Sequence, residues 1–256
     1  MVRERNSKRR LAAQQDESLP PTLQIPCGED DKCPLLRPGI EMLKTLGRTT
    51  FGGDGRPVCP CAHSCFFCSG VAAQRQAAHS AAATHTALEI GAGLGRFILA
   101  KARKNPDRHY IGLEIERVRS ARIDVKARKE GLRNISLVCA DAAWFLEFCV
   151  PPGSLDEIYI LFPDPWPRAK HEKNRIFQPD VIALIHRALR RGGVLHAATD
   201  HAAYFERMRE VMADEVAAGR FAEVAAPVRD EDELTDFELK FLAKGMTVNS
   251  AAWEKM

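Results

Sequence analysis

An acid and an aromatic ring follow an apolar, β-rich run in the second half of the chain, and a basic run comes directly after them. The run Ile158–Phe162 predicts a buried strand, and Asp164 and Trp166 follow it, each preceded by a proline. The prolines fix φ and remove backbone donors, so this turn is predicted to be stiff. Open α/β sheets bind ligands at the carboxyl ends of their strands. The order of these side chains therefore indicates a site for a nucleic-acid base.

The basic run is predicted to hold the phosphates that flank this base. Its four cations are Arg168, Lys170, Lys173 and Arg175. A surface histidine among cations is ordinarily a plain hydrogen-bonding residue, so His171 receives no catalytic role. The ring of Trp166 fits two interpretations equally well, namely stacking on the base and packing at the rim of the sheet.

A glycine-rich loop earlier in the chain joins a predicted strand to a predicted helix. Gly91, Gly93 and Gly95 give the spacing G-x-G-x-G, and glycine lets the backbone approach a ligand closely. The dinucleotide spacing is G-x-G-x-x-G, which presents helix N–H groups to a pyrophosphate. Here the acidic Glu89 precedes the loop; it would repel a phosphate but suits an ammonium group. S-adenosylmethionine carries an ammonium and a sulfonium and has no phosphate.

Acidic residues also end the next two predicted strands. Glu114 is placed to accept hydrogen bonds from both ribose hydroxyls of an adenosine, as in the analogous dinucleotide position. Asp141 is placed to accept from the adenine amine. Three acids at successive strand ends beside a glycine loop predict an adenosylmethionine site, with a general nucleotide site as the alternative.

With a methyl donor beside it, the Asp164 segment fits two base chemistries. One is methylation of an exocyclic amine, in which the side chain accepts the hydrogens of the amine. The other is methylation of guanine N7, an in-plane lone pair with no proton to lose, so that general-base help is not required. In that case an ionised Asp164 would accept from the N1–H and N2–H edge and offset the charge that develops on the ring. Asp164 is the predicted catalytic residue in both.

From Thr84 onward, strand and helix signals alternate, which is typical of an α/β fold with a mostly parallel twisted sheet and helices on both faces. We expect a catalytic domain at 84–256 and an irregular, Cys-rich extension at 1–83. The predicted strands are Thr86–Ile90, His109–Glu114, Ile135–Ala140, Ile158–Phe162 and Val194–Thr199. The predicted helices are Arg96–Asn105, Arg117–Glu130, Pro179–Arg190 and Tyr204–Ala213, and strand signals after Phe221 are weaker.

Composition sets the broad class of the protein. Of 256 residues, 45% are hydrophobic, which is ample for a core, and the formal net charge of +3 means that any case for nucleic acid rests on local clusters. No apolar run approaches the roughly 18 residues that span a bilayer, so we expect no membrane partner and a cytoplasmic location. Nothing in the sequence separates a monomer from a homodimer.

Six of the eight cysteines precede the predicted domain. Four of them, with one C-x-x-C spacing, offer a possible tetrahedral zinc site: Cys59, Cys61, Cys65 and Cys68. Structural zinc usually joins two ligand pairs across a loop of about a dozen residues, whereas these crowd into one short stretch. We therefore expect thiols and no metal.

Taken together, these motifs resemble the tRNA (guanine-N7-)-methyltransferase family, whose hallmark is a strand that ends in F-P-D-P-W before a basic run containing histidine. Here the hallmark is Phe162–Trp166 with Lys170–Arg175. Further matches are the Glu89 to Gly95 loop, Glu114, Asp141, Ala198–Asp200 and Leu234–Glu238. The likeness covers roughly residues 86 to 240.

The resemblance implies a Rossmann-like class I methyltransferase that uses S-adenosylmethionine to methylate a guanine in the variable loop of tRNA. It implies donor binding by Glu89, Gly91, Gly93, Gly95, Glu114, Asp141 and Asp164. It implies substrate contacts from Arg168, Lys170, His171, Lys173, Arg175, Asp200, Thr235, Phe237 and Glu238. The alternatives are a methyltransferase for another base or an exocyclic amine, and an RNA-binding homologue without catalysis.

Two segments of these motifs depart from the family pattern. Pro167-Arg168 stands where the family usually has His-Lys, which keeps one cation. Asp236 stands where a lysine is common in T-K-F-E, which reverses a charge in the predicted substrate segment.

Overall fold

The computed structural model describes residues 85–256. The predictions for the extension at 1–83, including the zinc alternative at Cys59, Cys61, Cys65 and Cys68, lie outside the described residues. The boundary at residue 84 stays a prediction. No group of three or more metal-ligating side chains occurs within residues 85–256, and none of the helices there is long and apolar enough to cross a membrane.

One sheet of seven strands forms the centre of the described part, in the order β3-β2-β1-β4-β5-β7-β6. The strands are β1 Thr86–Ile90, β2 His109–Leu113, β3 Ile135–Val138, β4 Leu155–Leu161, β5 Leu189–Thr199, β6 Phe221–Val224 and β7 Asn249–Lys255. β7 runs antiparallel to β5 and β6, and the other neighbours are parallel. The order reverses between β1 and β4, so the carboxyl ends of these two strands form the crevice where open α/β sheets bind ligands.

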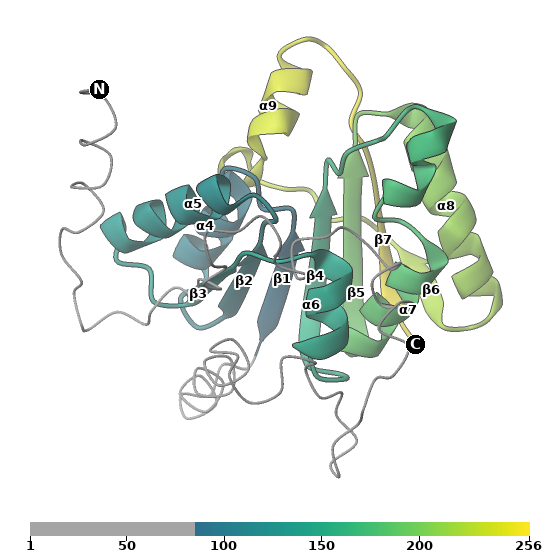
Figure 1. Ribbon diagram of the computed structural model, residues 1–256, viewed down its shortest axis with the longest axis horizontal. Coiled ribbons are helices and arrows are strands. Elements are labelled where there is room, and N and C mark those ends of the chain that lie inside the picture. The colour runs from purple at the N-terminus through teal and green to yellow at the C-terminus, as the bar shows by residue number, and fades with distance from the viewer. Residues whose placement is uncertain (1–84) are drawn as a thin grey trace, which may run out of the picture.

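Helices cover both faces of the sheet, as predicted (Figure 1). They are α4 Arg96–Lys104, α5 Arg117–Lys129, α6 Ala142–Phe148, α7 Pro179–Ala188, α8 Ala202–Ala217 and α9 Asp236–Leu242, with 3-10 helices η2 Ala169–Asn174 and η3 Glu231–Glu233. A large apolar core joins one face to α6, α7 and α8, and a second core joins the other face to α4 and α5. Figure 1 shows α9 beyond the carboxyl ends of the central strands.

The predicted elements differ from the observed ones at several places, three of which bear on the site. The helix predicted to reach Arg190 ends at Ala188, because Leu189 already pairs with Leu155 as the first residue of β5. β4 ends before Phe162, whose φ of 53° is incompatible with a strand. α6 was not predicted; it begins where the side chain of Asp141 caps the Trp144 N–H.

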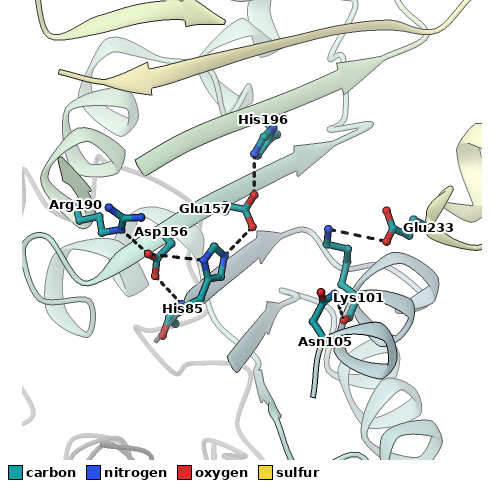
Figure 2. A network of polar contacts seen from close by, with 9 residues as sticks. His85, Lys101, Asn105, Asp156, Glu157, Arg190, His196 and Glu233 are labelled. Atoms are coloured by element: carbon teal, nitrogen blue, oxygen red, sulfur yellow. Dashed lines mark hydrogen bonds and ion pairs between the residues drawn. The ribbon is translucent and has the colours of Figure 1, made fainter. Parts of the chain in front are cut away.

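A network of buried charges lies between β1, β4 and β5, away from the crevice (Figure 2). Glu157 lies 2.8 Å from a ring nitrogen of His85 and 3.4 Å from one of His196. Burial alone would raise the pKa of Glu157, but the two histidines outweigh burial and lower it to about 2. His85 also lies 3.8 Å from Asp156, which is paired with Arg190. The network fixes the start of β1 against β4.

The glycine loop is also a packing contact. Gly95 has a φ of 81°, and a Cβ there would lie 2.6 Å from a side-chain carbon of Ile123 in α5. Gly91 has the same φ, but a Cβ there would meet nothing within 4 Å. Gly95 therefore lets α5 pack against the start of α4, whereas Gly91 faces open space.

These two glycines give a matched test of the packing. Both alanine variants place an L-residue at positive φ, which costs about 1–2 kcal/mol. Gly95→Ala adds a steric clash with Ile123, so we expect it to lower the free energy of unfolding by about 1–3 kcal/mol more than Gly91→Ala does. Urea unfolding without donor measures both. Equal losses would contradict the packing role, and in an Ile123→Ala background the excess cost of Gly95→Ala should shrink.

Candidate active site

The glycine loop lies at the carboxyl edge of the sheet, between β1 and α4. The backbone N–H groups of Gly91 and Ala92 donate to the carbonyl of Leu113 at 2.8 and 2.9 Å, which ties the loop to the end of β2. Gly91 and Gly93 have φ of 81° and 58°, in the left-handed region that favours glycine. The backbone is thus held open over the ends of β1 and β2, where a ligand can approach it closely.

Glu89 is buried beneath this loop with only 2% of its surface exposed. Its Oε2 atom is buried and has no hydrogen-bond partner in the described part of the chain. Burial, and then the nearby Glu114, raise the pKa of Glu89 to about 8. A buried carboxyl without a partner is costly, and a bound cation would favour its ionised form. Glu89 therefore suits a ligand with a positive charge.

Glu114 follows β2 and is also buried, with 5% exposed. One carboxylate oxygen accepts from the Gly93 N–H at 2.8 Å, and the other accepts from the Glu116 N–H at 2.9 Å. The side chain thus joins the glycine loop to the end of β2. Its oxygens lie at the strand end where the sequence predicts an acceptor for ribose hydroxyls.

Asp141 ends the segment after β3 and is half-buried. One of its oxygens accepts from the Trp144 N–H at 3.0 Å, so the residue caps α6. Two large apolar side chains near this point, Leu94 and Ile115, are 42% and 48% exposed and were not among the predicted site residues. They adjoin the glycine loop and Glu114 in the chain. The sequence held a signal for them, because they are large apolar residues beside the acids, and an adenine ring needs apolar surface as well as acceptors.

Asp164 lies in the loop that follows β4, next to β1 in the sheet. Phe162 and Trp166 bracket it with φ of 53° and 42°, and no other non-glycine residue in the described chain has a positive φ. Such conformations cost about 1–3 kcal/mol each and cluster at functional sites. The carboxylate is exposed and lies near Tyr204, whose pKa rises to about 12 through burial and, in smaller part, through the charge of Asp164.

Arg175 holds this strained loop from within. Its guanidinium donates to the carbonyls of Pro165 at 2.8 Å and Trp166 at 3.2 Å, and to the carboxylate of Glu172 at 3.1 Å. It also lies 5.2 Å from the ring centre of Tyr204. Only 12% of the side chain is exposed. The sequence predicted a phosphate contact at Arg175. In the structure, its side chain instead holds the backbone around Asp164.

The rest of the predicted basic run faces solvent. Arg168, Lys170 and Lys173 are exposed along η2 and the residue before it. His171 is half-buried, and its ring centre lies 5.6 Å from that of Trp166. The three exposed cations therefore form a basic surface beside the loop that carries Asp164.

α9 brings the last predicted substrate residues to the same edge. Thr235 and Glu238 form a capping box at the start of the helix. Glu238 is 4% exposed and faces inward, whereas Phe237 is 49% exposed. The rings of Phe237 and Phe241 stack at 6.3 Å, and Phe241 lies 5.8 Å from Phe162. An aromatic row thus connects α9 to the loop that carries Asp164.

Asp200 directly follows β5, the strand next to β4, and its side chain is half-buried. The carboxyl end of β5 lies at the same edge of the sheet as that of β4, because the two strands are parallel. The structure therefore brings Asp200, for which the resemblance implies a substrate contact, to the edge that holds Asp164. The side chains of both remain predictions as substrate contacts.

Known proteins that are similar to this chain include methyltransferases. Residues 83–251 match the family described as putative methyltransferase. The tRNA (guanine-N(7)-)-methyltransferase of Alcanivorax borkumensis is 39% identical over 168 residues, which are 65% of this chain and 69% of that protein. The protein of the same name from Yersinia enterocolitica is 36% identical over 171 residues, 66% of this chain and 70% of that one.

The chain belongs to the tRNA (guanine-N7-)-methyltransferase family. S-adenosylmethionine is the methyl donor of this class I enzyme family, so the predictions of family and cofactor are confirmed. Two solved structures share the fold. The 16S rRNA methyltransferase KamB has a TM-score of 0.51 and 17% identity, over 67% of this chain and 88% of that one. NSun6 from Pyrococcus horikoshii has a TM-score of 0.50 and 16% identity, over 68% of this chain and 48% of that one.

We expect the substitution Glu89→Gln to raise the stability of the protein and to weaken its binding of S-adenosylmethionine. The folded protein keeps a proton on Glu89 up to about pH 8, whereas an ordinary glutamate loses it near 4.5. The folded state therefore binds more protons in this window, and stability falls as the pH rises from about 4.5 to 8. Glu89→Gln removes this loss. We expect its melting temperature to exceed that of the wild type by at least about 2–4 °C at pH 8, and by less at pH 5.

The same variant should fail to bind S-adenosylmethionine, because the amide carries no charge to pair with the ammonium. Melting curves at three pH values and calorimetric titration with the donor measure the two effects. A melting difference that does not change with pH would show that Glu89 is already ionised in the free protein.

Proposed function

We propose that this protein transfers a methyl group from S-adenosylmethionine to N7 of a guanine in tRNA, in the variable loop. Family membership supports the reaction, and one structural observation supports the site: Glu89 ends β1 and Asp164 follows β4, its neighbour in the sheet. A donor held over β1 and a base held after β4 meet at the point where the strand order reverses. A tRNA substrate implies that the protein acts in the cytoplasm.

The donor half consists of residues whose chemistry fits each part of the ligand. The carboxyl of Glu89, whose Oε2 atom has no partner within residues 85–256, takes the ammonium group. Glu114 accepts from the ribose hydroxyls, and Asp141 accepts from the adenine amine. Gly91 and Gly93 let the backbone approach, and Gly95 supports them through its contact with α5. When bound, the donor supplies an electrophilic methyl group on a sulfonium.

The acceptor half positions the guanine, and the reaction there needs no proton transfer. N7 attacks with an in-plane lone pair, so the C–N bond forms as the C–S bond breaks and no proton has to leave first. Asp164 accepts from the N1–H and N2–H edge and offsets the positive charge that develops on the ring. Holding the two reactants in line supplies up to about 7–11 kcal/mol in intramolecular analogues. A stiff, strained loop suits this task.

The exposed basic surface of Arg168, Lys170 and Lys173 binds the RNA around the target base. His171 adds a ring edge beside Trp166, and Asp200, Thr235 and Phe237 face the same edge of the sheet. Double-stranded RNA hides N7 in a deep groove, so the target guanine lies in a loop. Cations beside the Asp164 loop would hold the phosphates on either side of it.

The identity of the product tests the proposal. The protein is incubated with methyl-labelled S-adenosylmethionine and bulk tRNA, which is then digested to nucleosides. We expect the label in 7-methylguanosine, and label in any other nucleoside would reject the proposal. Asp164→Ala should lower transfer at least about 100-fold while donor affinity changes little, since the contact is made to the base. Unchanged activity in that variant would remove Asp164 from the site.

Substitutions of Arg175 and Lys170 should have different effects on kcat and on tRNA binding, although both residues are cations of one run. Arg175→Lys loses the forked donation to two carbonyls, so we expect kcat to fall about 10-fold or more and tRNA affinity to keep its salt dependence. Lys170→Ala should leave kcat unchanged, weaken tRNA binding and reduce the slope of log affinity against log salt by about 1.

Steady-state kinetics and binding at several salt concentrations separate the two cases, with Lys173→Ala as a second exposed control. If Arg175→Lys keeps a normal kcat but changes the slope of log affinity against log salt, Arg175 contacts phosphate as the sequence predicted.

A further inference from the structure

The segment between β6 and α9, residues 225–235, is tied to the donor helix α4 by charges. The amine of Lys104 lies 2.6 Å from Asp230, 2.7 Å from Asp232 and 3.4 Å from Glu233. Figure 2 shows Lys101, one turn earlier, directed at Glu233, at 4.0 Å. These contacts tie the β6–α9 segment to the last turn of α4. At the start of α4, where the glycine loop ends, the guanidinium of Arg96 donates to the carbonyl of Leu234 at 2.9 Å, so the segment is held along the whole helix.

Arg229 is the cation of this segment that faces inward. Its guanidinium donates to Oε1 of Glu238 at 2.6 Å, and the two side chains are only 13% and 6% exposed. The second oxygen of Glu238 accepts from the Thr235 N–H at 3.4 Å within the capping box. The pair is therefore shielded from solvent, unlike a surface ion pair, and it determines where α9 begins.

The positive charge of Arg229 also reaches the donor site. Burial and Glu114 raise the pKa of Glu89, and the charge of Arg229 and the backbone N–H of Ile98 oppose that rise. One guanidinium thus pairs directly with a buried carboxylate from α9, and its charge also favours the ionised form of the buried carboxyl from β1. Neither the basic run nor the donor acids include this residue, so the proposed function leaves it without a role.

We propose that Arg229 is a positioning residue that couples the donor site to the acceptor side, because it stabilises the charge of Glu89 and fixes α9 through Glu238. The inference rests on the proposed function. From α9, the aromatic row of Phe237, Phe241 and Phe162 continues to the loop that carries Asp164. A shift of Glu238 would therefore move the exposed Phe237 ring relative to that loop.

The test compares Arg229→Met, which keeps the length and loses the charge, with Arg229→Lys, which keeps the charge. Donor affinity is measured with S-adenosylhomocysteine by calorimetry from pH 6 to 9, without RNA. We expect Arg229→Met to weaken affinity about tenfold near pH 7.5 and to move the midpoint of its pH dependence upward, because Glu89 then ionises less readily. Arg229→Lys should restore the midpoint. Within residues 85–256, the charged groups that act on Glu89 are Glu114 and Arg229 itself.

Lys104→Ala is the matched control, since it loosens the β6–α9 segment at its exposed end and leaves Arg229 in place. It should leave the midpoint unmoved. Glu238→Gln, which keeps the capping geometry, should lower kcat with tRNA and leave donor affinity unchanged.

An unmoved midpoint in Arg229→Met, or the same loss in Lys104→Ala, would show that Arg229 is only structural. If Arg229→Met does not fold, Arg229→Gln replaces it in the same titration. Failure of the proposed function is a separate result, because it would appear as the wrong methylated nucleoside from the wild-type protein while the donor titration remains interpretable.

Discussion

The buried carboxyl of Glu89 is the constraint on which the crevice depends. It is 2% exposed, carries an oxygen with no partner in the described chain, and lies under the loop that joins β1 to α4. Folding such a group is unfavourable, and strongly perturbed carboxyls of this kind cluster at functional sites. The surroundings follow from this requirement. Gly91 and Gly93 leave room for a ligand above it, Glu114 holds the loop against β2, and Arg229 moderates the cost of the charge.

The acceptor half relies on a different physical device, which is backbone strain held by one side chain. Phe162 and Trp166 adopt positive φ on either side of Asp164, and Arg175 binds the carbonyls of Pro165 and Trp166 from below. In the proposed reaction, rigidity replaces acid–base chemistry, because a lone pair on N7 needs orientation and a nearby negative charge. The two halves meet without a hinge, since β1 and β4 are paired neighbours in one sheet.

Much of this arrangement follows from local sequence. Glycines at a strand end, acids after three strands and a proline-bracketed aspartate are local signals, and β1 was predicted with its observed bounds. β7 was not predicted, because its two central alanines favour a strand only once β5 and β6 pair on either side. The direction of a charged side chain also depends on the fold. Arg175 and Glu238 were predicted to contact substrate, yet both face inward, because partners outside the predicted motifs, such as Tyr204 and Arg229, decide their orientation.

Proton release on donor binding tests the central claim most directly. At pH 6.5 both the buried Glu89 of the free protein and the amine of the donor, with an ordinary pKa of about 7.7–8.0, hold their protons. Pairing an ammonium with a carboxylate then expels the proton of Glu89. Calorimetric titration with S-adenosylhomocysteine in two buffers of different ionisation enthalpy should show release of about one proton per donor bound by the wild type. Binding at pH 6.5 without proton release would contradict the account.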